Sequence, residues 1–532
     1  MVPITVTAEG KSVRAELTVA EPGWTVWMVP HFHYDPVWWN TQAAYTTSWD
    51  TAGEVAQRFR VGFQHTGFEL MRLHLDTARR DPDYKFVLAE IDYLKPYWDA
   101  HPGDRAHLRR LIAEGRVELV GGTYNEPNTN LTTAETTIRN FVYGIGFQRG
   151  VMGGDPATAW QLDVFGHDPQ FPGLAADAGL TSSSWARGPH HQWGPMLTDR
   201  DREQDGWGDP SSMQFPAEFE WLSPSGKGVL THYMPAHYSA GWWMDRAATL
   251  GDAQDAVLEL WRLMREVAST RNVLLPVGTD YTPPNRWVTE IHREWRYTWP
   301  RLVCGLPREF FAAVRAELAA PSPQTRDMNP VYTGKDVSFI DTKQAQRAAE
   351  SLLIDAEKFA TIAAVETGAG YPHALIDKAW RQLVYGAHHD AITGSESDQV
   401  YLDLVTGWRE AYDIGRDVLR AALVRLSPAT DGVVVFNPSS WPRTDLVRVR
   451  LPLPDGCDTW EFGDGTPVLV ENTDGSSADL LFVAADVPPS DTASSTRVPP
   501  SQARPRAGRR PRGRGSRTGP TPSRSTPRGA AA

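Results

Sequence analysis

Two histidines and an aspartate lie close together in VPHFHYDPVWW, residues 29–39, after a short apolar run. His33 and Asp35 flank one residue, and in an extended segment residues i and i+2 point to the same side. Their imidazole and carboxylate therefore face the same space, as a zinc or similar divalent ion requires. Alone, such a pair is more often an ordinary hydrogen-bonded one. His31 shares this face and is interpreted as structural or as a partner of a ligand.

Two further aspartates follow predicted strands. WQLDVFGHDPQFPG places Asp163 at a strand end before a sharp turn, a suitable position for a nucleophile or a ligand. VGTDYTPP places Asp280 at another strand end, where apolar neighbours can raise its pKa, as a general acid requires. For either residue alone, a helix cap, an ion pair or a turn is the commoner role.

A fourth motif, YGAHHDAITGSESD, places His388, His389 and Asp390 at the end of a predicted helix. Adjacent residues on a helix point about 100° apart, so we expect only one of these histidines to bind a shared metal ion. The alternative is a buried polar helix end. Together the four motifs offer His and carboxylate ligands for a metal ion, and carboxylates for two further roles, nucleophile and general acid. A metal-assisted glycosidase needs such a set.

The elements that must position these motifs alternate between strands and helices. Strand-like runs are TVWMVPHF, KFVLAEI, RVELVGGTY, TAWQLDVF and NVLLPVGTD, with amphipathic helical runs between them. This order predicts an α/β fold with a mostly parallel sheet or barrel. In such folds functional residues gather at the carboxyl ends of the strands, which is where the motifs lie.

The predicted domains differ in the period of their apolar residues and in composition. They are an N-terminal arm (1–25), a catalytic α/β domain (26–330), a three-helix bundle (331–430), an incomplete β domain (431–488) and a disordered Arg/Pro-rich tail (489–532). The tail composition cannot bury enough apolar surface to fold. We interpret this end as truncated or frame-shifted; the alternative is a basic tail that contacts anions.

Composition narrows the class of protein. The chain has 532 residues, 41% hydrophobic and 22% charged, as is typical of a soluble globular protein. A formal net charge of −12 argues against nucleic-acid binding. Two distant cysteines, Cys304 and Cys457, argue against a disulfide framework or a cysteine-based zinc site. Because no signal peptide and no apolar run of membrane-spanning length are found, we expect a cytoplasmic protein without a membrane partner.

The motifs HFHYDPVWW, WQLDVFGHDP, VGTDY and HHDAITGSESD, in this order, resemble glycoside hydrolase family 38, the retaining α-mannosidases. The resemblance covers about residues 25–440. It implies a seven-stranded β/α barrel-like catalytic domain, a three-helix bundle and then β-sandwich domains. It also implies a mannose-containing oligosaccharide or glycoconjugate as substrate, and because family members often associate, a homo-oligomer is one option.

Carried onto this chain, the resemblance implies one Zn²⁺ ion, two catalytic aspartates and several substrate contacts. The implied ligands are His33, Asp35, Asp163 and His389. Asp163 is also the implied nucleophile, with Asp280 as acid/base. The implied substrate contacts are Trp38, Arg187, His388 and Asp390. Two alternatives are a zinc-dependent carbohydrate deacetylase on a similar barrel and an inactive sugar-binding fragment.

Overall fold

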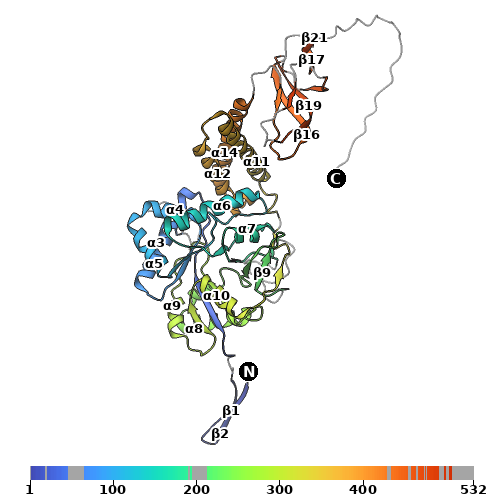
Figure 1. The fold of residues 1–532 in the computed structure, drawn as a ribbon. Coiled ribbons are helices and arrows are strands. Elements are labelled where there is room, and N and C mark those ends of the chain that lie inside the picture. Colours follow the sequence, from blue (N-terminus) through green and yellow to red (C-terminus); the bar gives the residue numbers. More distant parts are fainter. Residues whose placement is uncertain are drawn as a thin grey trace, which may run out of the picture. The chain divides into compact units, whose positions relative to one another are not determined.

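Two compact units make up the chain in a computed structural model (Figure 1). One unit comprises Met1–Thr361 and Gly370–Ala422, and the other comprises Ile362–Ala369 and Leu423–Ala532. The described residues are 2–17, 21–45, 65–189, 192–193, 213–332, 334–427, 433–452, 457–462, 465–471, 474, 476–489, 496–498 and 502–505.

Parallel strands form the centre of the first unit. β3 (Thr25–Pro30) lies between β11 (Asn272–Val277) and β12 (Arg301–Cys304), parallel to both. β4 (Phe86–Leu88) pairs in parallel with β5 (Val117–Leu119). Every residue of β4, β5 and β11 is buried, and these residues are apolar except for Glu118 in β5 and Asn272 in β11.

A third sheet has the order β13–β9–β10–β7–β6, in which only the β9–β10 pair is antiparallel. Its strands are β6 (Thr158–Gln161), β7 (Ser182–Trp185), β9 (Glu218–Leu222), β10 (Gly228–Tyr233) and β13 (Pro323–Gln324). The predicted mixed α/β fold with mainly parallel strands is confirmed. The closure of these strands into a seven-stranded barrel stays a prediction. Within the described residues, the strands around the site form three separate hydrogen-bonded sheets.

Helices connect these strands. They are α3 (Gly67–Arg80), α4 (Ile91–Ala100), α5 (Arg105–Ala113), α6 (Ala134–Phe147), α7 (Phe171–Asp177), α8 (Leu250–Met264), α9 (Val288–Glu294) and α10 (Pro307–Glu317). Thr133 is the N-cap of α6, and its hydroxyl accepts from the Thr136 N–H. The helical run between the first two predicted strands, AGEVAQRFRVGFQHTGFELMRLHLDTARR, spans 52–80; α3 matches its second part, and 52–64 lies outside the described residues.

Three long helices follow, as predicted. They are α11 (Ile340–Thr367), α12 (His373–Gly386) and α14 (Asp398–Leu426), grouped in Figure 1, with the short α13 (His389–Thr393) between the last two. Arg139 of α6 forms an ion pair of 2.6 Å with Glu357 of α11 and stacks over Trp380 of α12. These contacts attach the helices to the α/β part of the first unit.

The second unit is rich in antiparallel strands. β19 (Ser477–Val487) pairs with β16 (Arg443–Pro452) and β18 (Val468–Glu471) around a small core that includes Phe462 and Phe482. Within the predicted tail, the short strands β20 (Thr496–Val498) and β21 (Gln502–Pro505) are described. Residues 490–495, 499–501 and 506–532 of this tail lie outside the described residues. The predicted N-terminal arm contains a hairpin of β1 (Val2–Ala8) and β2 (Lys11–Leu17).

Candidate active site

Residues of the candidate site follow the carboxyl ends of several strands. His33 and Asp35 follow β3, Asp163 follows β6, Arg187 follows β7 and Asp280 follows β11. The carboxyl ends of parallel strands open on one edge of a sheet, so these loops converge. The expectation that the motifs lie at strand ends is met for these three motifs, whereas HHDAITGSESD follows helix α12.

The β3–β11 pairing continues into the site. The His33 N–H donates to the Thr279 carbonyl at 3.2 Å, and the Tyr281 N–H donates to the His33 carbonyl at 3.0 Å. These bonds form an isolated parallel bridge between His33 and Asp280. The backbone therefore sets the position of the proposed acid/base relative to a proposed metal ligand.

The helical region supplies His389 through a contact with the loop after β5. Pro127 forms an antiparallel bridge with His388, and the His389 N–H donates to the Glu126 carbonyl at 3.0 Å. The two histidines do not end a helix as predicted, because α12 ends at Gly386 and α13 begins at His389. His388 is the non-helical N-cap residue of α13, so the helical 100° argument does not apply to the pair.

The four predicted metal ligands lie close together. The Asp35 Oδ1 atom is 2.8 Å from His33 Nε2 and 3.1 Å from His389 Nε2. The Asp163 Oδ2 atom is 3.9 Å from His33 Nε2 and 3.7 Å from His389 Nε2. A tetrahedral ion about 2.0 Å from each ligand sets neighbouring ligands about 3.3 Å apart, within this range.

The chemistry of these atoms also fits a cation. His33 Nε2, His389 Nε2 and Asp35 Oδ1 are buried and have no partner of hydrogen-bond geometry among the described residues. Burial alone raises the pKa of Asp35, but the His33 and His389 imidazoles outweigh it and hold that pKa well below its usual range. An ionised carboxylate between two imidazoles suits a divalent ion.

Hydrogen bonds distinguish the two adjacent histidines. His389 Nδ1–H donates to the Glu126 carbonyl at 3.0 Å, which leaves the Nε2 lone pair directed at Asp35 and Asp163. His388 Nδ1 instead accepts from the Asp390 N–H at 3.2 Å. A neutral His388 then carries its proton on Nε2, which cannot bind a metal. The geometry therefore favours His389 over His388 as the ligand.

Asp163 is the most accessible of the four ligands. Its side chain is 13% exposed, against 0% for His33 and 2% for Asp35. The Arg187 Nε–H donates to its Oδ1, and the Asp163 N–H donates to Glu126 Oε2 at 2.9 Å. The Arg187 contact orients the carboxylate, and the Glu126 contact holds the backbone that carries it.

Asp280 has the properties of a carboxyl group that exchanges protons near neutral pH. Burial, followed by the Asp35 and Asp163 charges, raises its pKa to about 6 against the opposing effect of His33. The Tyr238 hydroxyl donates to Asp280 Oδ1 at 2.8 Å. The unassigned His31 donates from Nε2 to the Tyr238 carbonyl at 3.0 Å, so its role is structural support of this tyrosine.

Of the predicted substrate contacts, Arg187, His388 and Asp390 contact the cluster, whereas no contact described for Trp38 reaches it. Trp38 is half-buried beside the exposed Trp39, and its carbonyl accepts from the Ser397 N–H at 2.9 Å. Asp390 accepts from the Ser395 hydroxyl and lies 3.8 Å from His389 Nε2. Burial and the Asp35 charge raise the pKa of Asp390 well above its usual range.

Sequence reasoning missed several residues in the same cluster. Glu126 contacts His33, and burial together with the Glu126 charge raises the pKa of the adjacent Glu90 well above its usual range. Glu90 lies near the end of the predicted strand KFVLAEI and Glu126 follows the predicted strand RVELVGGTY, so the signal that singled out Asp163 was present. Tyr238 and Tyr332, which accepts from Arg187, had no comparable signal.

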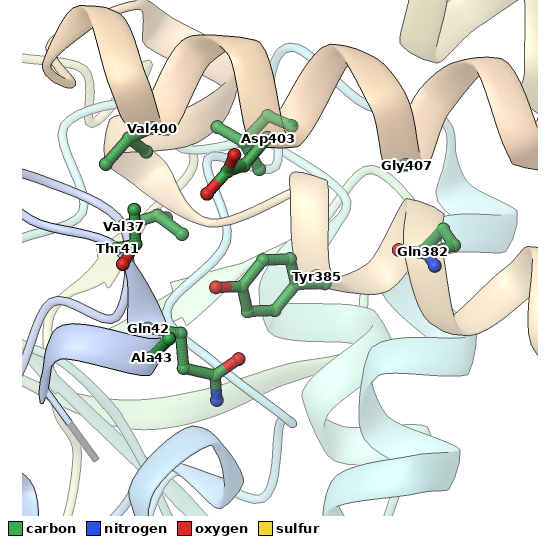
Figure 2. A pocket seen from close by; sticks show the side chains of 10 residues that line it. Val37, Thr41, Gln42, Ala43, Gln382, Tyr385, Val400, Asp403 and Gly407 are labelled. Atoms are coloured by element: carbon green, nitrogen blue, oxygen red, sulfur yellow. The ribbon is translucent and has the colours of Figure 1, made fainter. Parts of the chain in front are cut away.

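A cavity of about 140 Å³ lies between the segment after β3 and helices α12 and α14. Figure 2 shows Val37, Thr41 and Gln42 on one side, with Tyr385 and Asp403 on the other. Among the described residues, none of the four predicted ligands lines it. It is therefore a neighbour of the cluster and not its substrate-facing side.

Residues 23–335 match the family model described as glycosyl hydrolases family 38 N-terminal domain, and residues 331–426 match the alpha mannosidase middle domain. Alpha-mannosidase 2C1 of Homo sapiens is 23% identical over 398 residues, covering 72% of this chain and 35% of that protein. Alpha-mannosidase F of Dictyostelium discoideum is 24% identical over 481 residues, covering 80% and 45%. The chain thus spans less than half the length of these relatives.

Solved structures agree with these matches. The crystal structure of an alpha-mannosidase from Enterococcus faecalis V583 has a TM-score of 0.62 and 20% identity, covering 88% of this chain and 55% of that one. At this identity the similarity establishes a common fold. Among the described residues, no helix combines the length and apolar character needed to cross a membrane.

Proposed function

The chain belongs to glycosyl hydrolase family 38, and on that basis we propose that it hydrolyses terminal α-mannosides with retention of the anomeric configuration. The observation that carries the proposal is the position of Asp163 and Asp280. Both lie beside the His33–Asp35–His389 cluster, and the Asp163 charge contributes to the raised pKa of Asp280. The proposed substrates are mannose-containing oligosaccharides or glycoconjugates.

One divalent ion, proposed to be Zn²⁺, would be held by His33, Asp35, Asp163 and His389. Two imidazoles and two carboxylates are a donor set that suits zinc, and the ligand separations given above support four-coordination. When bound, the ion supplies Lewis-acid contacts to adjacent sugar hydroxyls.

The two aspartates have complementary roles in the proposed reaction. Asp163 attacks the anomeric carbon while protonated Asp280 gives its proton to the leaving oxygen, and the glycosidic C–O bond breaks. The product is a glycosyl ester on Asp163. Asp280, now a carboxylate, takes a proton from water, which attacks the same carbon and releases mannose. This second step restores both carboxyl groups to their starting states.

Neighbouring side chains support these roles. The Arg187 guanidinium binds Asp163 Oδ1, and its fixed charge orients the carboxylate for attack. Trp38, half-buried and close to the cluster in sequence, is proposed to stack on the sugar ring, with His388 and Asp390 near its hydroxyls.

Hydrolysis of an aryl α-mannoside, measured with and without a chelator, tests the function and its metal dependence. We expect turnover that is lost on chelation and restored by Zn²⁺. A 2-deoxy-2-fluoro mannosyl substrate should leave an adduct on Asp163, located by peptide mass spectrometry. A deacetylase would release acetate from an acetylated sugar and form no adduct, and a sugar-binding fragment would bind without turnover.

A further inference from the structure

Glu126 makes contacts with three of the proposed ligands, although its own side chain is not in that set. Its Oε1 atom lies 3.6 Å from His33 Nδ1, and its Oε2 atom accepts from the Asp163 N–H at 2.9 Å. Its carbonyl accepts from both the backbone N–H and the Nδ1–H of His389, each at 3.0 Å. Only 1% of this residue is exposed, so water does not compete for these contacts.

Each contact constrains a group that a metal ion would need. The Glu126 carboxylate lies 3.6 Å from His33 Nδ1, beyond hydrogen-bond length, so its charge favours a proton on that nitrogen electrostatically and leaves the Nε2 lone pair facing Asp35 and Asp163. The carbonyl does the same for His389. The bond to the Asp163 N–H holds the backbone that carries the proposed nucleophile.

We infer that Glu126 is the positioning residue that orients His33, His389 and Asp163 together for metal binding. The inference rests on the proposed function. Glu126 acts through the ligands that it contacts, so its proposed role does not require contact with the substrate.

Glu218 offers a matched control elsewhere in the fold. It is also 1% exposed, its Oε1 lies 2.8 Å from His232 Nδ1, and its Oε2 accepts from the Ser269 N–H at 2.7 Å. None of its described contacts reaches a proposed metal ligand. Glu218→Gln thus removes a buried carboxylate with the same kinds of partner, without touching the site.

The test measures the Zn²⁺ dissociation constant of the full chain by competition with a chromophoric chelator, alongside kcat and KM for an aryl α-mannoside. Glu126→Gln should weaken Zn²⁺ binding about 10- to 100-fold, the usual effect of losing a partner that orients a metal ligand. Its kcat should fall more than its KM changes, even at saturating zinc. The Zn²⁺ affinity of Glu218→Gln should stay within about twofold of the parent's. This holds even if both variants lose stability, because Glu218 has no described contact with a proposed ligand.

A folded Glu126→Gln chain with the parent's Zn²⁺ affinity would overturn the inference while leaving the proposed function intact. If Glu126→Gln does not fold, Glu126→Asp is tested instead. The shorter side chain keeps the negative charge but moves it away from both His33 and the Asp163 N–H. Parent-like affinity in folded Glu126→Asp overturns the inference equally. A parent chain that binds no Zn²⁺ and cleaves no α-mannoside contradicts the proposed function itself.

Discussion

His33 and Asp280 are joined by a parallel backbone bridge that extends the β3–β11 ladder past the ends of both strands. A proposed metal ligand and the proposed acid/base are therefore held by main-chain hydrogen bonds and not by side chains alone. Small changes in the spacing of these strands should alter the metal site and the proton donor together.

Gly278 provides a test of this strand spacing. A methyl group at this position would lie 1.9 Å from the His31 carbonyl oxygen, so Gly278→Ala forces β3 and β11 apart. We expect a loss of about 1–3 kcal/mol in the free energy of unfolding, measured in urea, and a large loss of activity. Gly146→Ala in α6 is the control, because no atom lies within 4 Å of its added methyl. Equal stability in the two variants would contradict the close-approach argument.

Asp163→Asn should reduce kcat on the order of 10⁴-fold or more, because the amide cannot form the glycosyl ester. Zinc binding should weaken but persist, since the amide oxygen remains near His33 and His389. Steady-state turnover and zinc stoichiometry measure the two effects. Asp168→Asn, in the same loop, removes a carboxylate whose single contact among the described residues is with the Gln170 N–H, and it should retain activity. Near-normal rates in Asp163→Asn would remove Asp163 from the nucleophile role.

The pH dependence of kcat/KM should report Asp280. Its acid form donates the proton, and burial raises its pKa to about 6, so the rate should decline as pH rises through about 6. Asp280→Asn should abolish this decline and lower the rate about 10²- to 10⁴-fold for a poor leaving group. A dinitrophenyl mannoside, which needs no protonation, should be affected much less. Equal losses for both substrates would exclude an acid role.

Tyr238→Phe should move this decline to higher pH. The phenol donates to Asp280 Oδ1 and stabilises the carboxylate, so its removal favours the protonated acid and raises the pKa of Asp280. The full pH profile of kcat/KM measures the shift. Tyr143→Phe, which removes a tyrosine–carboxylate bond to Asp377, should leave the profile unchanged. A downward shift in Tyr238→Phe would contradict the assigned direction of this hydrogen bond.

Zinc affinity should differ between His389→Ala and His388→Ala, although the two residues are adjacent. Only His389 directs an unprotonated Nε2 at Asp35 and Asp163, because its Nδ1–H is held by the Glu126 carbonyl. We expect His389→Ala to weaken zinc binding by at least about 100-fold and His388→Ala by less than about tenfold. Chelator competition measures both. The reverse order would assign the ligand to His388.

Local pattern was sufficient for much of the fold and for the motif positions. The capped α6, the three long helices and the buried strands β3, β6 and β11 follow from short-range periodicity and cap residues. The antiparallel β9–β10 pair was not predicted, although its turn is local: the Ser223 N–H donates to the Lys227 carbonyl at 2.8 Å and the Gly226 N–H to the Ser223 carbonyl at 2.9 Å.

Alternation along an extended segment is a property of the backbone, so local sequence was enough to predict that His33 and Asp35 share one side. The reason to prefer His389 over His388 lies in the tertiary structure, where both imidazoles approach Asp35, at 3.1 and 3.6 Å, but His389 is the one that presents an unprotonated Nε2. That choice depends on the hydrogen bond from His389 to Glu126, between residues 263 positions apart in the chain. The same contact places Glu126 in the cluster. Hydrogen bonds between residues so distant in sequence are set by the fold and cannot be predicted from local residue spacing.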